Sequence, residues 1–241
     1  MLILGLDACC MAATAALCGD GYLVAASLTN CGRTHSQKIM PQIAQALANA
    51  EVEVRDIDVF AAAVGPGSFT GVRIGVATVK GLAQAYNKPC AAVSTLEALA
   101  NNVSCFSGLI CPILDARREQ VYNALFKGDG SGEMKRLCED RALALEDLID
   151  ELKTSGEKVM FLGDGVFAFK ETIAEKLGKR AVFAKKHLTM NLAGSVAELA
   201  YKQAENGELV SYGELIPQYI RLSQAERERM ERLNAERRPR S

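Results

Sequence analysis

A glycine-rich run of eleven residues, GPGSFTGVRIG at positions 65–75, constrains the fold of this chain more than any other segment. It follows the apolar segment 59–64, which is typical of a buried strand. It opens a series of apolar residues from Ile74 to Tyr86 whose spacing predicts an amphipathic helix. Glycine lets a backbone come close to its neighbours. The run therefore predicts an α/β unit with a tight turn from strand to helix.

The residues alone leave two interpretations of this turn open. The free N–H groups at the start of a helix can cradle a phosphate, or the glycines can let the helix pack closely. The run is not a Walker A loop, because no Gly-Lys-Ser/Thr follows at the required spacing, and it is not GxGxxG. The candidate site residues of the loop are Gly65, Pro66, Gly67, Ser68, Phe69, Thr70, Gly71, Arg73 and Gly75.

The order of the predicted elements indicates two α/β lobes that begin alike, with strands before helices. The first lobe covers residues 1–103, with strands over 1–6, 12–17, 22–28, 57–64 and 90–93 and helices over 36–50, after Phe69, and over 95–101. The polar stretch 101–108 is predicted to link the lobes. The second lobe covers residues 104–222, with strands over 109–114, 120–126, 133–138 and 159–162 and helices over 145–152, 167–177 and 191–206.

The last helix of the second lobe is expected to be able to pack back on the first lobe. Residues 223–241 alternate Arg and Glu and are predicted to form a charged, disordered tail. The formal net charge of -1 gives no global attraction to nucleic acid, so any RNA contact requires a local patch or a partner.

Composition also bears on compartment and membrane. Eight cysteines without a C-x-x-C pair indicate buried, reduced thiols. No signal peptide is predicted, since Asp7 comes too early, and no apolar run is long enough to span a membrane. We expect a soluble, cytoplasmic protein that makes no membrane contact.

Three charged residues are candidates for a position near a nucleotide. Asp7 ends the first strand, and Asp115 and Arg117 close the first strand of the second lobe. A phosphate cradle needs hydroxyl or free backbone donors after such an acid, and residues 8–11 are Ala, Cys, Cys and Met. The loop is poor in the donors that hydrolysis needs. Asp115 and Arg117 have a second interpretation, as a charged hairpin with a surface ion pair.

Neither a zinc protease nor a serine hydrolase is indicated. The two histidines, His35 and His187, lie far apart and form no H-E-x-x-H or H-x-x-x-H motif. Ser68 lacks the G-x-S-x-G context and has no identifiable base. We predict no catalytic residue, no metal site and no cofactor required by this chain.

Two helices of the first lobe carry apolar stripes. Such stripes usually form a chain's own core, and the alternative is a face shared with a second subunit. The candidate interface residues are Ile39, Ile43, Leu47, Val76, Val79 and Ala83.

Motifs in fixed order resemble those of the TsaB family, from the first strand to about Glu226. They are LGLD at 4–7, His35-Ser36, the run at 65–75, KGLA at 80–83, VSTLE at 93–97, DAR at 115–117 and PQYIR at 217–221. The resemblance implies the two-lobed α/β fold of actin-like and sugar-kinase-like ATPases (the ASKHA fold), with a reduced second lobe.

The resemblance also implies a function. TsaB proteins are non-catalytic scaffolds needed for the N6-threonylcarbamoyladenosine modification (t6A) at position 37 of ANN-decoding tRNAs. A heterodimer with TsaD would form through the two N-terminal helices and support binding of the ATPase TsaE and of tRNA. TsaC would supply threonylcarbamoyl-adenylate, and the partner subunits would carry ATP and metal. A homodimer is expected through the same face when TsaD is absent.

TsaD has a metal-binding H-x-x-x-H pair where this chain has Thr95 and Leu99. Neither side chain ligates a metal in that role. Together with the donor-poor loop after Asp7, this favours a packing turn over a phosphate cradle at 65–75. The alternatives are a stand-alone ATPase or kinase, which Asp7→Ala would inactivate, and a peptidase, which Ser68→Ala would inactivate.

Overall fold

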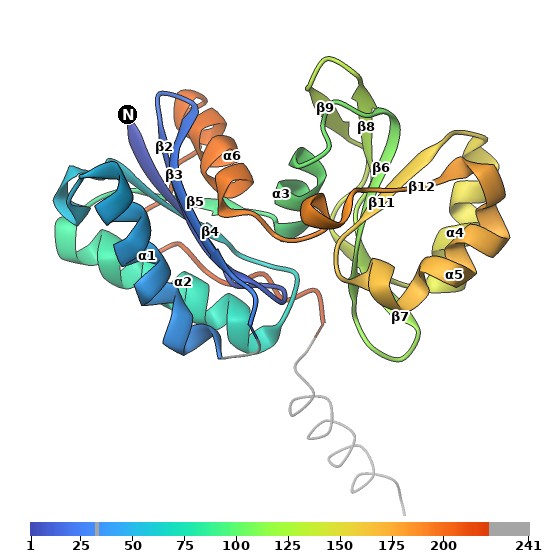
Figure 1. The fold of residues 1–241 in the computed structure, drawn as a ribbon, viewed down its shortest axis with the longest axis horizontal. Helices are drawn as coiled ribbons and strands as arrows, with labels where there is room; N and C mark the ends of the chain where they lie inside the picture. Colours follow the sequence, from blue (N-terminus) through green and yellow to red (C-terminus); the bar gives the residue numbers. More distant parts are fainter. Residues whose placement is uncertain (32–33, 222–241) are drawn as a thin grey trace, which may run out of the picture.

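The computed structural model describes residues 1–31 and 34–221, which form two α/β lobes side by side (Figure 1). The predicted tail at 223–241 lies outside the described residues. Within the described part of the chain, no helix combines the length and the apolar character needed to cross a membrane.

The first lobe is a five-stranded sheet in the order β3-β2-β1-β4-β5. The strands are β1 (Leu2–Asp7), β2 (Ala13–Gly19), β3 (Tyr22–Thr29), β4 (Val59–Ala63) and β5 (Cys90–Val93). β1, β2 and β3 form an antiparallel meander, whereas β4 runs parallel to both β1 and β5.

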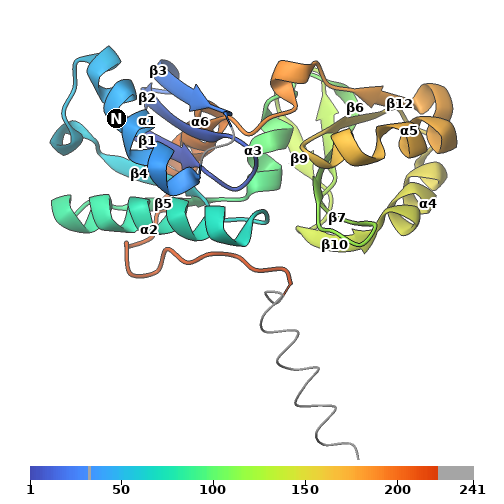
Figure 2. The ribbon, with the colours of Figure 1, turned by 60° about the horizontal axis from the view of Figure 1, so that its bottom comes forward.

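Helices cover both faces of this sheet (Figures 1 and 2). α1 (His35–Ala50) and α2 (Phe69–Tyr86) lie on one face, and α6 (Ala193–Glu205) lies on the other. Every residue of β4 is buried, because it has helices on both sides. This explains why the central strands are continuously apolar instead of alternating.

The second lobe is built on a seven-stranded sheet, ordered β10-β7-β6-β11-β12, in which β8 pairs with β6 and with β9. Its strands are β6 (Ser107–Asp115), β7 (Gln120–Asn123), β8 (Phe126–Asp129), β9 (Met134–Arg136), β10 (Arg141–Ala144), β11 (Val159–Leu162) and β12 (Ala181–Phe183). Two helices, α4 (Leu145–Ser155) and α5 (Gly165–Leu177), pack on it and bury residues such as Leu148 and Ile173.

The short helix α3 (Thr95–Asn101) joins the lobes. Its Leu96 and Leu99 share one core cluster with Leu114 and Phe126 of the second lobe. The last helix, α6, lies against β1 and β2 and buries Val196 there, so in space it belongs to the first lobe.

Three details differ from the sequence-based prediction. The segment 120–126 is two strands, β7 and β8, which pair with different parts of β6. The predicted linker at 101–108 overlaps the end of α3 and the start of β6. The strands β10 and β12 were not predicted, because they are only four and three residues long and half-buried, so they show no alternation.

Candidate functional site

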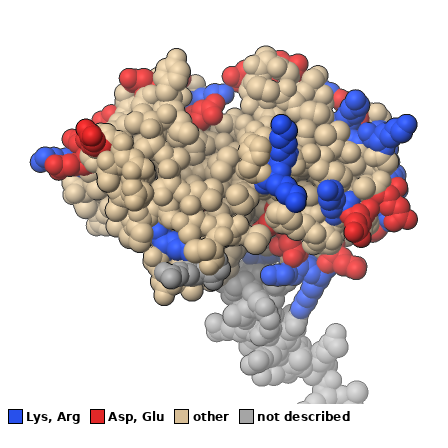
Figure 3. Space-filling model, viewed as in Figure 1, with Lys and Arg blue, Asp and Glu red and all other residues tan. Residues whose placement is uncertain are grey.

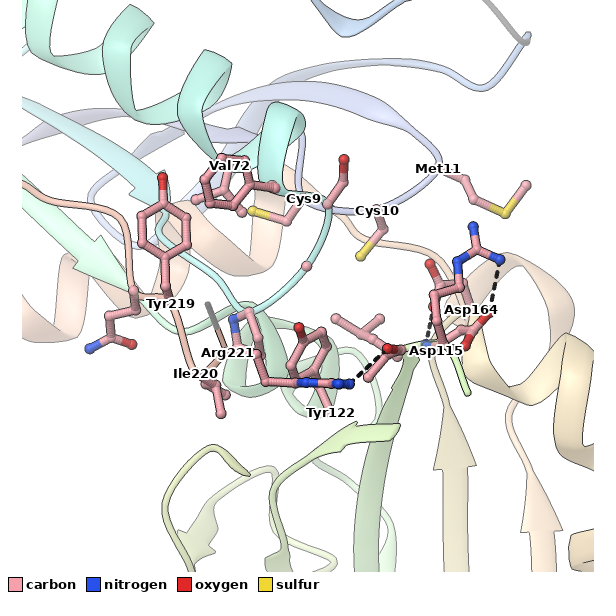
Figure 4. Close-up of a pocket in the computed structure, with 18 of the residues that line it drawn as sticks. Cys9, Cys10, Met11, Val72, Asp115, Tyr122, Asp164, Tyr219, Ile220 and Arg221 are labelled. Carbon is pink, nitrogen blue, oxygen red and sulfur yellow. Dashed lines mark hydrogen bonds and ion pairs between the residues drawn. The ribbon is translucent and has the colours of Figure 1, made fainter. Parts of the chain in front are cut away.

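A cleft of about 700 Å³ lies between the two lobes. Figure 4 shows Cys10 and Met11 of the first lobe across from Asp115 and Asp164 of the second. The wall on the first lobe is the loop after β1 and the glycine-rich run, and the wall on the second is the end of β6 and the start of α5. The lining residues are Cys9, Cys10, Met11, Pro66, Gly67, Ser68, Phe69, Val72, Leu114, Asp115, Ala116, Arg117, Tyr122, Asp164, Phe167, Ala168 and residues 218–221.

Asp7 is not among the described residues that line this cleft. It is completely buried, and its Oδ1 accepts a hydrogen bond from the backbone N–H of Cys9 at 2.8 Å. Burial raises the pKa of Asp7 to about 6, against the effect of this hydrogen bond. The buried carboxyl group of Asp7 therefore stabilises the loop after β1 through this hydrogen bond. Asp115 and Arg117, in contrast, do line the cleft.

The glycine-rich run packs tightly on the loop after β1. A Cβ atom at Gly71 would lie 2.0 Å from the carbonyl oxygen of Ala8, and one at Gly67 would lie 2.4 Å from that of Cys9. The backbone N–H of Ser68 also donates to the Cys9 carbonyl at 2.7 Å. At these positions glycine is required because another backbone is already there, as the packing interpretation expects.

Ser68 caps a helix. Its Oγ accepts a hydrogen bond from the backbone N–H of Gly71 at 3.3 Å, which satisfies one free donor of the first turn of α2. Among the described residues, no hydrogen bond joins Ser68 to a histidine. Burial lowers the pKa of His35, at the start of α1. The arrangement has no activated serine.

The acidic residues at the second wall of the cleft hold a turn together. Asp115 accepts a hydrogen bond from the backbone N–H of Arg117 at 2.7 Å, and the two side chains form an ion pair at 3.3 Å. The backbone N–H of Asp115 donates to Asp164 Oδ1 at 3.1 Å, and burial raises the pKa of Asp164. The Arg117 side chain is largely exposed, so its ion pair contributes little to stability.

In residues 1–31 and 34–221, no three or more His, Cys, Asp or Glu side chains gather in a way that could hold a metal ion. Thr95 and Leu99 are both buried at the junction of the lobes. Cys9 and Cys10, next to the cleft, have thiol pKa values raised mainly by burial, so they stay protonated near neutral pH.

The structure corrects the predicted partner interface. All six residues assigned to it are buried in the first lobe's own core, none more than 8% exposed: Ile39, Ile43, Leu47, Val76, Val79 and Ala83. The predicted apolar stripes of α1 and α2 are present, but their side chains pack against the sheet of the first lobe. These side chains cannot contact a partner without unfolding the lobe.

The outward face of the same two helices has a different character. Every exposed residue of α1 is uncharged, including Met40, Ala44 and Ala48. On α2 the small residues Ala77 and Gly81 are exposed one turn apart, and a Cβ at Gly81 would meet nothing within 4 Å. Figure 3 shows that most of the visible surface of this lobe is free of charge, whereas charged residues gather on the second lobe.

Sequence reasoning did not place the segment 216–221 in the cleft. Its PQYIR motif was identified only by family resemblance. The ring of Tyr219 stacks on Phe69 at 4.7 Å between centroids, and Arg73 Nε donates to the Tyr219 hydroxyl at 2.8 Å. These partners are about 150 residues apart, so no local pattern reports the contact.

Known proteins resemble this chain over nearly its whole length. The family model described as "TsaD: tRNA N6-adenosine threonylcarbamoyltransferase" matches residues 29–229. The tRNA threonylcarbamoyladenosine biosynthesis protein TsaB of Bacillus subtilis (strain 168) is 35% identical over 228 residues, 94% of this chain and 96% of that protein. TsaB of Escherichia coli (strain K12) is 29% identical over 225 residues, 92% of this chain and 95% of that protein.

Solved structures agree in fold. A Pseudomonas aeruginosa protein described as similar to the peptidase YeaZ superposes with a TM-score of 0.78 and 27% identity, over 91% of this chain and 99% of that chain. A ROK hexokinase of Thermus thermophilus reaches a TM-score of 0.50 at 12% identity, over 86% of this chain and 100% of that chain, which is a likeness of fold alone. The predicted actin-like and sugar-kinase-like fold class is confirmed.

Proposed function

Because this chain belongs to the TsaB family of tRNA threonylcarbamoyladenosine biosynthesis proteins, we propose that it is the non-catalytic scaffold subunit of t6A modification. In this role it forms a heterodimer with a TsaD protein, supports the binding of TsaE and of tRNA, and leaves ATP and metal to its partners. Two copies associate through the same face when TsaD is absent.

The observation that carries the proposal is the outward face of α1, whose exposed residues are all uncharged, together with the exposed small residues of α2 that follow Arg73. Helices pack closely when small residues recur one turn apart, as Ala44 and Ala48 do on α1 and Ala77 and Gly81 do on α2. Gly81 has no packing role among residues 1–31 and 34–221, since none of their atoms outside its own helix turn lies within 4 Å of its Cβ position. A pair of helices from another subunit fits such a face.

The chemistry of the cleft supports a scaffold over a stand-alone ATPase or a peptidase. Asp7 is buried beneath the loop, the glycine run is packed against the carbonyl oxygens of residues 8 and 9, and Ser68 serves as a helix cap. The backbone N–H groups of Ser68 and Gly71 are therefore engaged within the chain, and the carbonyl oxygens of residues 8 and 9 occupy the space that a phosphate would need.

A charge placed on the outward face tests the interface. We expect Ala77→Glu to raise the Kd for TsaD at least about tenfold, because a carboxylate would have to lose its water where small residues now allow close packing between the subunits. The matched control is Ala174→Glu, on an exposed position of α5 in the second lobe. Both variants should fold normally. Equal affinity of Ala77→Glu and the parent chain for TsaD would show that the interface lies elsewhere.

Reconstitution tests the function itself. Modification of an ANN-decoding tRNA by TsaC, TsaD and TsaE should require this chain, and Ala77→Glu should reduce it while Ala174→Glu does not. An Asp7→Asn chain that still supports modification would agree with a scaffold. ATP turnover by the purified chain alone, abolished by Asp7→Ala, would instead identify an independent ATPase.

A further inference from the structure

The last described segment of the chain, residues 216–221, crosses from the first lobe to the second. We call this segment the strap. It leaves the first lobe beneath α2, as Figure 2 shows. Upstream, Val210 forms a backbone bridge with Cys90 at the edge of β5. Within the strap, the backbone N–H of Gln218 donates to the carbonyl of Val64 at 2.8 Å.

The strap is fastened to the first lobe by three side chains. Tyr219 stacks on Phe69, and the guanidinium of Arg73 lies 3.8 Å from the centre of the Phe69 ring while it donates to the Tyr219 hydroxyl. Phe69 and Arg73 stand in the first two turns of α2. The strap is therefore held at the start of this helix.

Gly65 lets the strap come this close. A Cβ at Gly65 would lie 2.6 Å from the carbonyl oxygen of Gln218, and Gly65 has a φ of +117°, which favours glycine. The group that approaches the first residue of the glycine-rich run is thus a carbonyl of the chain itself.

The same segment is hydrogen-bonded to the second lobe by Arg221. Arg221 Nη1 donates to the carbonyl of Ala116 at 3.0 Å, in the turn between β6 and β7. Figure 4 shows Arg221 extending from the strap toward the end of β6, next to Asp115. Six consecutive residues therefore contact both walls of the cleft.

The strap also divides the space between the lobes. The cleft of about 700 Å³ lies on one side of it, and a second cavity of about 540 Å³ lies on the other. Gln218, Tyr219 and Ile220 line both cavities. The second cavity has polar walls that include Glu97 and Arg136. The strap is thus the wall between the two cavities.

We propose that the strap is a latch that joins the two walls of the cleft and separates the two cavities. Its release merges the cavities into one cleft that exposes Gly65 and loosens the cleft walls, while the core that α3 shares with the second lobe keeps the lobes joined. The segment is suited to release because Ile216 and Tyr219 remain 64% and 44% exposed, and Arg221 supplies its hydrogen bond to the second lobe. Few buried contacts oppose its local opening.

The chain contains no tryptophan, so Tyr219→Trp makes the strap the only source of indole fluorescence. The substitution keeps an aromatic ring on Phe69 but loses the hydrogen bond from Arg73, so every further variant is compared within this background. In this background Arg221→Ala should increase acrylamide quenching of the indole. It should also speed amide exchange of the strap about tenfold, the change expected when one charge-assisted hydrogen bond is lost.

Two control variants separate the latch from general loosening. Lys80→Ala removes a contact of Lys80 with the carbonyl of Gly213, upstream of the strap, and should leave quenching unchanged. Arg221→Lys keeps an N–H donor and should stay closer to the parent than Arg221→Ala.

Amide exchange of the two cleft walls, residues 8–11 and 114–117, decides whether the strap joins these walls. Faster exchange of both walls in Arg221→Ala would support the latch. Unchanged quenching in Arg221→Ala would overturn the proposal, and so would a freed strap beside walls that exchange as in the parent.

Discussion

Substitution of Gly71 by alanine tests whether the glycine-rich run is a packing turn. The new Cβ would lie 2.0 Å from the carbonyl oxygen of Ala8. The two atoms must separate by about 1 Å or more before they stop overlapping. Both are fixed to backbone, one in the first turn of α2 and one in the loop after β1, so no side-chain rotation relieves the clash.

The expected loss of stability follows from this geometry. Overpacking of a closely packed site costs about 1–3 kcal/mol, and a clash between two backbones lies at the upper end. The better helix propensity of alanine offsets up to about 1 kcal/mol of this. We therefore expect a net loss of about 2 kcal/mol, which lowers the Tm of a domain of this size by roughly 4–8 °C.

Gly81 of the same helix provides the matched control. A Cβ at Gly81 would meet nothing within 4 Å, so Gly81→Ala should stabilise the free chain by about 0.5–1 kcal/mol through helix propensity alone. Thermal and urea unfolding, followed by circular dichroism, compare the two variants. If Gly71→Ala is as stable as Gly81→Ala, packing does not require glycine at position 71, and the phosphate-cradle interpretation would be favoured again.

Two further predictions concern buried residues. Burial raises the pKa of Asp7 from 3.8 to about 6, so between these pH values the folded chain holds a proton that the unfolded chain releases. The stability that this proton gives the folded chain is complete below the unfolded pKa and is lost as pH rises through about 6. Relative to Asp7→Asn, the free energy of unfolding of the parent should fall by about 2.5 kcal/mol between pH ~4 and pH ~7.5, measured by urea titration; parallel pH profiles would contradict it. Ile43, 1% exposed, is a core residue, so Ile43→Glu should lose more than about 4 kcal/mol and unfold by circular dichroism. A well-folded Ile43→Glu chain that merely fails to bind TsaD would restore the first interface assignment.

The fold was largely predictable because its elements carry strong local patterns. β4 is buried on both faces and reads as a continuous apolar segment, and α1 shows its buried stripe at helical spacing. β10 and β12 were not predictable, since short, half-buried strands depend on pairing with distant partners. α6 packs on the first lobe, as the sequence analysis expected that it could, although helical periodicity does not report this position.

The interface prediction failed for a related reason. A helical stripe identifies the face that avoids water, and a buried core and a subunit interface satisfy that requirement equally well. Ile43 and Val79 proved to be core residues. The outward face carries a weaker signal, an absence of charge on α1 and small residues such as Ala44 and Ala77. This pattern can be recognised only when the buried side of each helix is known.

The glycine-rich run shows where sequence reasoning reaches its limit. Glycine reports that another group comes close, but it does not name that group. Here the neighbours are three carbonyl oxygens of the chain itself, from Ala8 at Gly71, from Cys9 at Gly67 and from Gln218 at Gly65.

The carbonyl oxygens beside the glycine-rich run repel a phosphate. A phosphate could approach Gly65 only after the strap has left, so anion binding and the latch exclude each other at this residue. Nucleotide should therefore bind more weakly to the parent chain than to Arg221→Ala. Equal binding of nucleotide to the two chains would show that the strap does not block the approach of a phosphate to Gly65.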